Sequence, residues 1–77
     1  MTKIALETID DVKNFVGETM RLPVDVTLRS GKFVVDGKSI MGIFSLNLAE
    51  PVTLVIESDD EAQKADVLAK LDKFIVK

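Results

Sequence analysis

Histidine and cysteine are both absent from the 77 residues of this sequence. Histidine phosphotransfer and thiol chemistry therefore have no side chain to carry them out. A zinc-type metal site is excluded on the same ground, because zinc is bound mainly by cysteine and histidine. The lack of cysteine also excludes a disulfide framework. We expect no metal and no cofactor, so the function has to depend on other side chains.

Clustered basic residues and a long apolar run are missing as well. Ten basic residues stand against thirteen acidic ones, and the basic residues are scattered along the chain. This argues against a nucleic-acid partner, because binding to a phosphate backbone needs clustered Lys and Arg. The longest apolar stretch, over 40–48, is interrupted and too short to span a bilayer, and the first residues show no signal-peptide pattern. We expect a cytoplasmic protein without membrane insertion.

The length of the chain limits what it can do. Seventy-seven residues supply material for one hydrophobic core, so we expect a single domain over residues 1–77. A composition of 47% hydrophobic and 30% charged residues is typical of a globular protein. A domain this small has little room for a deep catalytic pocket, which favours surface recognition over enzyme activity. The oligomeric state is left open.

Hydrophobic periodicity in the first half of the chain predicts a strand, a helix and a hairpin. Residues 2–6 have the pattern of a short strand, and Thr8 has the side chain of a helix N-cap. The apolar stripe of the helix after Thr8 consists of Ile9, Val12, Phe15, Val16 and Met20. Pro23 is expected to end this helix. Alternation over 24–29 and 32–36, around a Ser-Gly turn, predicts two paired strands.

The middle of the second half predicts a short helix and a strand. Ser39 is a preferred N-cap for a helix that continues through Leu46. Asn47 follows, a residue type that tolerates the left-handed turn with which many helices end. A strand is expected over 52–57, where β-branched residues are enriched.

The last helix carries the clearest signals in the sequence. Ser58 and Glu61 have the spacing of a capping box, and acidic residues fill the first turn. Its apolar stripe is expected to consist of Ala65, Leu68, Leu71 and Ile75. The predicted order is therefore β-α-β-β-α-β-α. We expect an α+β fold, with the helices gathered on one face of an antiparallel sheet.

The short helix contains more apolar side chains than one of its faces can bury. These side chains are Ile40, Met41, Ile43, Phe44 and Leu46. If Ile43 and Leu46 face the sheet, the other three are partly exposed and form a surface for a protein partner. The alternative is that all of them belong to the core of a small protein.

The motif Lys38-Ser39-Ile40-Met41-Gly42 resembles the regulatory segment of the HPr family, the phosphocarriers of the bacterial sugar phosphotransferase system. The resemblance extends more loosely over 8–74, with matches at 23–28 and 59–62. It implies an HPr-like open-faced sandwich: a four-stranded antiparallel sheet of order 1-4-2-3, with three helices on one face. This agrees with the element order predicted from periodicity.

The sequence departs from the family where HPr proteins carry phosphate on a histidine at the start of the first helix. Counted back from Ser39 without gaps, the histidine position falls at Thr8 and the following arginine position at Asp10. The stretch ahead of Thr8 is also several residues too short for the loop that presents the histidine. A threonine phosphate ester is inert where a phosphohistidine is labile, and Asp10 would repel phosphate. Phosphocarrier activity is therefore disfavoured, and no catalytic residue is expected.

The resemblance implies that Ser39 is a regulatory phosphorylation site for an HPr kinase. A transcriptional regulator or a phosphotransferase-system component is then the expected protein partner. Lys38, Ile40, Met41, Gly42 and Phe44 are the candidate partner-binding residues. The protein would be similar to the catabolite-repression paralogue of HPr, which also lacks the histidine. In the simpler alternative, Ser39 serves only as a helix cap.

Other interpretations stay open at this stage. The chain could be a binding or assembly module that shares only the fold, or a residual phosphotransferase-system component. A ferredoxin-like ligand-binding domain would require a different strand order. The acidic run 59–61 is expected to serve the helix dipole rather than a metal. Gly31, Gly37 and Gly42 lack the spacing of a phosphate-binding fingerprint.

Overall fold

The computed structural model describes residues 2–76. It contains four strands, three α-helices and a final 3₁₀ turn, in the predicted order. The elements are β1 (Thr2–Ile4), α1 (Ile9–Thr19), β2 (Val26–Ser30), β3 (Phe33–Asp36), α2 (Ile40–Phe44), β4 (Val52–Ile56), α3 (Glu61–Lys70) and η1 (Asp72–Phe74). No helix in this described part of the chain is long and apolar enough to cross a membrane.

The strands form one antiparallel sheet of order β1-β4-β2-β3. Leu28 of β2 pairs with Val35 of β3 on one side and with Leu54 of β4 on the other. β2 and β3 are joined by a tight turn in which Gly31 adopts φ +58°, a conformation that glycine reaches without strain. The order confirms the α+β prediction, and it differs from the order that the ferredoxin-like alternative required.

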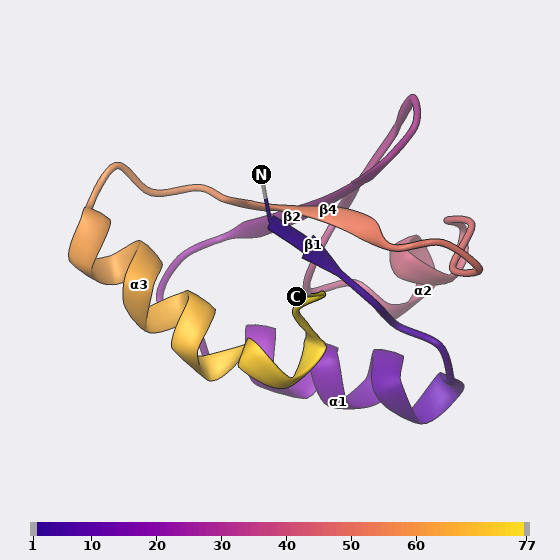
Figure 1. Ribbon diagram of the computed structural model, residues 1–77, viewed down its shortest axis with the longest axis horizontal. Coiled ribbons are helices and arrows are strands. Elements are labelled where there is room, and N and C mark those ends of the chain that lie inside the picture. The colour runs from indigo at the N-terminus through magenta and orange to yellow at the C-terminus, as the bar shows by residue number, and fades with distance from the viewer. Residues whose placement is uncertain (1, 77) are drawn as a thin grey trace.

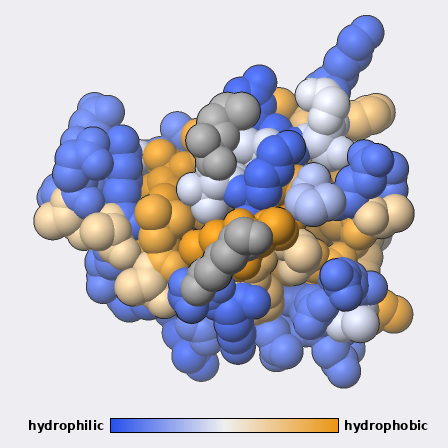
Figure 2. All heavy atoms as spheres, viewed as in Figure 1, coloured by the Kyte–Doolittle hydropathy of each residue, from blue (hydrophilic) through white to orange (hydrophobic). Residues whose placement is uncertain are grey.

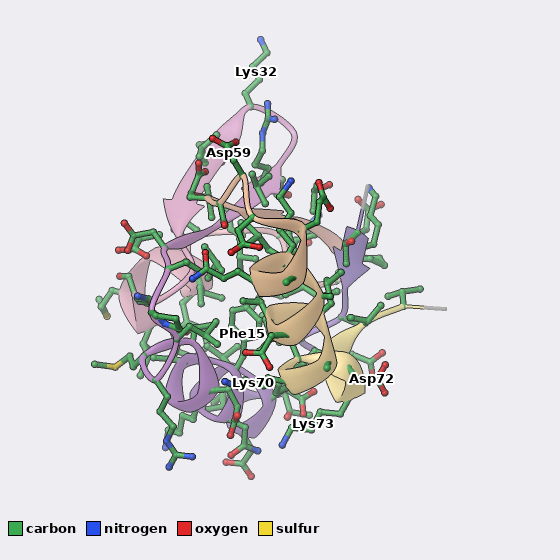
Figure 3. The ribbon with its side chains drawn as sticks, turned by 90° about the vertical axis from the view of Figure 1, so that its left-hand side faces the viewer. Phe15, Lys32, Asp59, Lys70, Asp72 and Lys73 are labelled. Carbon is green, nitrogen blue, oxygen red and sulfur yellow. The ribbon has the colours of Figure 1, made fainter. Side chains whose placement is uncertain are left out.

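The helices cover one face of the sheet, as Figure 1 shows for α1 and α3 below the strands. The core between these layers is continuous. Phe15 of α1 lies near its centre and packs edge-on against Phe74, with the two ring centroids 5.3 Å apart. Figure 3 shows Phe15 between α1 and α3. This aromatic pair joins the first helix to the last turn of the chain, and the other sheet face stays open.

The apolar stripe predicted for α1 is partly wrong. Val12, Phe15 and Val16 are buried as expected, whereas Ile9 and Met20 are exposed. Ile9 is the first residue of the helix and Met20 is its C-cap. The helix ends at Thr19, earlier than Pro23 alone would require, because the chain enters a series of turns from Met20.

The expected caps in the second half also need correction. Asp60, rather than Ser58, is the N-cap of α3, and its carboxylate accepts from the amides of Ala62 at 2.9 Å and Gln63 at 3.3 Å. The hydroxyl of Ser58 accepts from the amide of Asp60 at 3.1 Å instead, because the helix begins only at Glu61. α2 ends at Phe44 rather than Leu46. Asn47 does not adopt a left-handed conformation; its side chain instead accepts from the amide of Ala49 at 3.1 Å.

The buried face of α3 and η1 differs from the predicted stripe. Leu71 is buried as expected, and Leu68 and Ile75 are half-buried against the core. Ala65 is exposed, and its place is taken by the buried residues Val67 and Phe74. The change from α-helix to 3₁₀ geometry after Lys70 alters the helical period, so a stripe of constant spacing misplaces the last positions.

Candidate functional site

Ser39 is the N-cap of α2, as predicted. Its backbone is extended (φ −110°, ψ 112°), and its Oγ accepts a hydrogen bond of 3.1 Å from the amide of Gly42. Its own amide donates to the carbonyl oxygen of Asp36 at 3.1 Å. The side chain is half-buried. The hydroxyl is therefore held in a fixed position at the start of the helix.

Gly42 allows the helix to approach its own cap closely. A Cβ at this position would lie 3.2 Å from Ser39 Oγ and 3.3 Å from the Cβ of Val35. Both distances are tighter than ordinary contacts, so a larger residue would push α2 away from β3. Close packing therefore explains why position 42 is a glycine, and its role in partner binding stays a prediction.

Lys38 is tied down by the fold. Its amide donates to Asp36 Oδ1 at 2.9 Å, and its Nζ donates to the carbonyl oxygen of Leu22 at 3.4 Å. Nζ also forms an ion pair with Asp25 Oδ1 at 3.5 Å, and the Lys38 side chain is only 25% exposed. The lysine links the segment before α2 to the connection between α1 and β2. Partner binding by Lys38 stays a prediction.

The apolar side chains of the short helix fall into a buried set and an exposed set, as the first of the two interpretations expected. Ile43 and Leu46 are buried in the core. Met41 is 81% exposed, Phe44 42% and Ile40 38%. The alternative that all of them are core is wrong, because a helix of this length buries only one face. We call Ile40, Met41 and Phe44 the α2 patch.

One residue that periodicity passed over, Thr19, contacts the residue just before this segment. The hydroxyl of Thr19, which is fully buried, donates to the carbonyl oxygen of Gly37 at 2.8 Å. Met20 follows it and is exposed. The end of α1 therefore lies against the residue before Lys38. A threonine within an amphipathic helix gives no signal of such a contact, so sequence reasoning had no means of finding it.

The N-terminus of α1, where the family resemblance locates the phosphohistidine, is occupied by side chains of the chain itself. Thr8 is the N-cap, and its Oγ1 accepts from the amide of Asp11 at 3.0 Å. The Asp11 carboxylate accepts from the amides of Glu7 at 3.0 Å and Thr8 at 3.2 Å. Together with Asp10, this end carries two carboxylates in its first turn. The two amides just before the helix are therefore bound by a carboxylate, and the amide of Asp11 is bound by the hydroxyl of Thr8.

The remaining candidate residues have structural roles. Asp60 caps α3, and within residues 2–76 no group of three or more His, Cys, Asp or Glu side chains is placed to hold a metal. Gly31 forms the hairpin turn. Gly37 lies against Val26, whose Cγ2 would be 2.6 Å from an added Cβ. The cap formed by Asp60 agrees with the prediction that the acidic run serves the start of this helix.

The family model for the HPr component of the phosphotransferase system (PTS), described as its phosphorylation site, matches residues 11–77. The fold described above, a small α+β domain with strand order 1-4-2-3 and a serine-capped short helix, agrees with this match. The chain therefore belongs to the HPr family. The match begins after Thr8, so it leaves out the position to which the resemblance assigns the histidine. No curated protein matches the sequence at a significant level.

Solved structures of HPr-type proteins are similar to this fold. HPr-C-His from Thermoanaerobacter tengcongensis is 29% identical, with a TM-score of 0.68 over 92% of this chain and 81% of that one. Crh, the catabolite repression protein of Bacillus subtilis, described as a domain-swapped dimer, is 29% identical, with a TM-score of 0.65 over 97% and 88%. An HPr dimer from T. tengcongensis is 28% identical, with a TM-score of 0.63 over 88% and 79%.

Proposed function

We propose that the protein is a non-catalytic, HPr-like regulatory protein of the phosphotransferase system or of carbon catabolite control. Ser39 is its phosphorylation site, and Lys38, Gly42 and the α2 patch form its docking surface. The observation that carries the proposal is the 81% exposure of Met41 on a helix whose cap is Ser39. An unbranched, exposed methionine is well suited to contact with a protein partner.

Phosphorylation of Ser39 would change this surface without refolding the protein. The hydroxyl already faces the amide of Gly42, so phosphate oxygens attached to it would lie near the positive end of α2. A phosphate adds about −1.5 to −2 charges at neutral pH beside the α2 patch. A partner with a basic and apolar surface would then distinguish the two forms. The proposed partners are proteins only: an HPr kinase, and a transcriptional regulator or PTS component.

The proposal includes a cytoplasmic location and a single functional unit over residues 1–77. The similarity to Crh supports a role in catabolite control. The absence of histidine from the whole chain supports a role that does not use the phosphocarrier reaction. The carboxylate of Asp11, bound to the start of α1, supports the same conclusion.

Incubation with an HPr kinase and ATP, followed by intact-mass measurement, tests the proposal. We expect one phosphate on the wild-type protein and none on Ser39→Ala. Ser45→Ala is the matched control, because Ser45 is an exposed serine at the other end of the same helix. An unmodified wild-type protein, or a phosphate that survives Ser39→Ala, would contradict the phosphorylation site. Ser39 would then act as a helix cap, in a module that shares the family fold.

A residual phosphocarrier role is the second candidate, since the chain belongs to the PTS HPr family. Incubation with phosphoenolpyruvate and the first enzyme of the system separates it from the proposal. We expect no change of mass, because no imidazole is present to accept the phosphoryl group. An acid-labile adduct would show that another side chain has replaced the histidine.

A further inference from the structure

The two edges of the sheet differ in how they are covered. β1 forms one edge, and the end of the chain runs alongside it. Ile75 forms an antiparallel bridge with Ile4, and the amide of Val76 donates to the carbonyl oxygen of Lys3 at 2.9 Å. This segment satisfies backbone groups that would otherwise attract another strand, so the β1 edge is protected.

The opposite edge, β3, has no such cover. Within residues 2–76, β3 pairs with β2 alone. Phe33 and Val34, the first two residues of the strand, are both exposed, and Val34 is 58% exposed. Figure 1 shows the turn of the β2–β3 hairpin projecting beyond the helices. An apolar edge strand without a neighbour is a template for pairing with another strand.

The direction of the free backbone groups follows from one hydrogen bond. The amide of Gly37 donates to the carbonyl oxygen of Val26 at 2.8 Å, so the backbone amide of Gly37 points toward β2. The backbone amides and carbonyl groups of alternate residues in a strand point toward the same neighbour. Those of Phe33 and Val35 therefore also point toward β2. The amide and carbonyl groups of Val34 and the amide of Asp36 then point away from β2, toward the open edge, whereas the carbonyl oxygen of Asp36 accepts from the amide of Ser39.

We propose that β3 pairs antiparallel with β3 of a second copy of this chain, about a two-fold axis at Val34. In this register Val34 lies opposite the partner's Val34, and their outward amides and carbonyls exchange hydrogen bonds. Both valines lie on the open face of the sheet, because Val34 pairs with the exposed Arg29 of β2. The two sheets become one, with the helices of both copies on the same side.

Charge complementarity selects this register and a second copy as the occupant. Lys32 and Asp36 lie two residues on either side of Val34, so each faces its opposite charge in the partner. Lys32 extends from the hairpin tip, away from the body of the molecule (Figure 3), where a second copy can approach it. Both ion pairs form at once, because the two-fold axis repeats every contact. A shift of register by two residues would lose both.

A disulfide trap tests the register directly, because the chain has no cysteine. Hydrogen-bonded antiparallel partners have Cα atoms about 5.5 Å apart, a separation that a disulfide bridges. We expect Val34→Cys to form a crosslinked dimer under mild oxidation. Arg29→Cys is the control: it is exposed on the same face, but three strand spacings would separate the two copies by roughly 14 Å, too far for a disulfide. Equal crosslinking rates would overturn the proposal.

Sedimentation equilibrium of the untagged chain over a range of concentrations provides the second arm. We expect a concentration-dependent dimer that Val34→Pro abolishes. The amide removed by proline points away from β2, so the hairpin itself loses no hydrogen bond. Val34→Ile should still dimerise, and circular dichroism checks that both variants fold. A strictly monomeric wild-type chain would overturn the proposal. A dimer that survives Val34→Pro would also overturn the proposal, because it would show that the two copies associate through an element other than β3.

A charge-exchange series tests the ion pairs. Lys32→Asp and Asp36→Lys should each weaken the dimer, and the double variant Lys32→Asp/Asp36→Lys should restore it. Asp36 also accepts from the amide of Lys38 within its own chain, so a folding defect would affect the double variant as much as the single one. Recovery in the double variant therefore reports on the pairing between copies. Failure to recover, with all variants folded, would overturn the register.

Discussion

The hydroxyl of Thr19 donates a hydrogen bond of 2.8 Å to the carbonyl oxygen of Gly37. Thr19 is the fully buried last residue of α1, and Gly37 comes two residues before the candidate phosphorylation site, Ser39. The same hydroxyl lies 3.2 Å from the carbonyl oxygen of Val16, and its single proton favours the shorter contact. The bond fixes the end of α1 against the start of the α2 segment.

Replacement of Thr19 by Val tests this relationship. Valine has nearly the same shape but no donor, so the buried carbonyl of Gly37 loses a partner. We expect the free energy of unfolding in urea to fall by about 1–3 kcal/mol. Thr53→Val, on the open face of β4, should change it by less than about 0.5 kcal/mol. A Thr19→Val protein as stable as the control would show that the hydrogen bond contributes nothing.

Two glycines should respond to alanine in opposite directions. At Gly37, the added Cβ would lie 2.6 Å from Val26 Cγ2 and 3.0 Å from its carbonyl oxygen. We expect Gly37→Ala to lower the free energy of unfolding by about 1–3 kcal/mol. At Gly17, inside α1, an added Cβ would meet no atom within 4 Å outside the backbone of its own helix, and alanine should raise stability by about 0.5–1 kcal/mol. Thermal or urea unfolding measures both, and the same sign for both variants would contradict this account.

The division of the short helix into a buried and an exposed face predicts different effects of the same substitution. Met41→Asp should leave the thermal transition within a few degrees, because the side chain is 81% exposed. Ile43→Asp should prevent folding, since it introduces an unpaired charge into the core. Circular dichroism during heating separates the two. A large loss of stability in Met41→Asp would place Met41 in the core.

The sequence predicted the serine-capped helix correctly because both of its signals are local. A hydroxyl cap acts on an amide three residues away, and burial of Ile43 but not Met41 follows from helical period. Fold and strand order came from the family resemblance together with the alternating patterns. These features need no knowledge of distant contacts.

The wrong predictions concern features that depend on contacts between distant residues or on the residue at which a helix begins. The exposure of Ile9 and Met20 depends on which distant residues pack against the two ends of α1, and no local pattern contains that information. Asp60 rather than Ser58 is the cap because α3 begins at Glu61, and the hydroxyl of Ser58 accepts from the amide of Asp60 instead. Pairing of Thr19 with Gly37 joins residues 18 positions apart and could be found only from the three-dimensional fold.

The rate of Ser39 phosphorylation in variants of the α2 patch measures whether Ser39 and this patch act together. With an HPr kinase and ATP, we expect Met41→Asp to lower kcat/KM by about tenfold or more, as loss of an interface contact does. Val76→Asp, exposed beside β1 at the other edge of the sheet from β3, should leave kcat/KM unchanged. This pair of results would show that Ser39 and the α2 patch act as one site. Equal rates for both variants and the wild-type protein would contradict that claim.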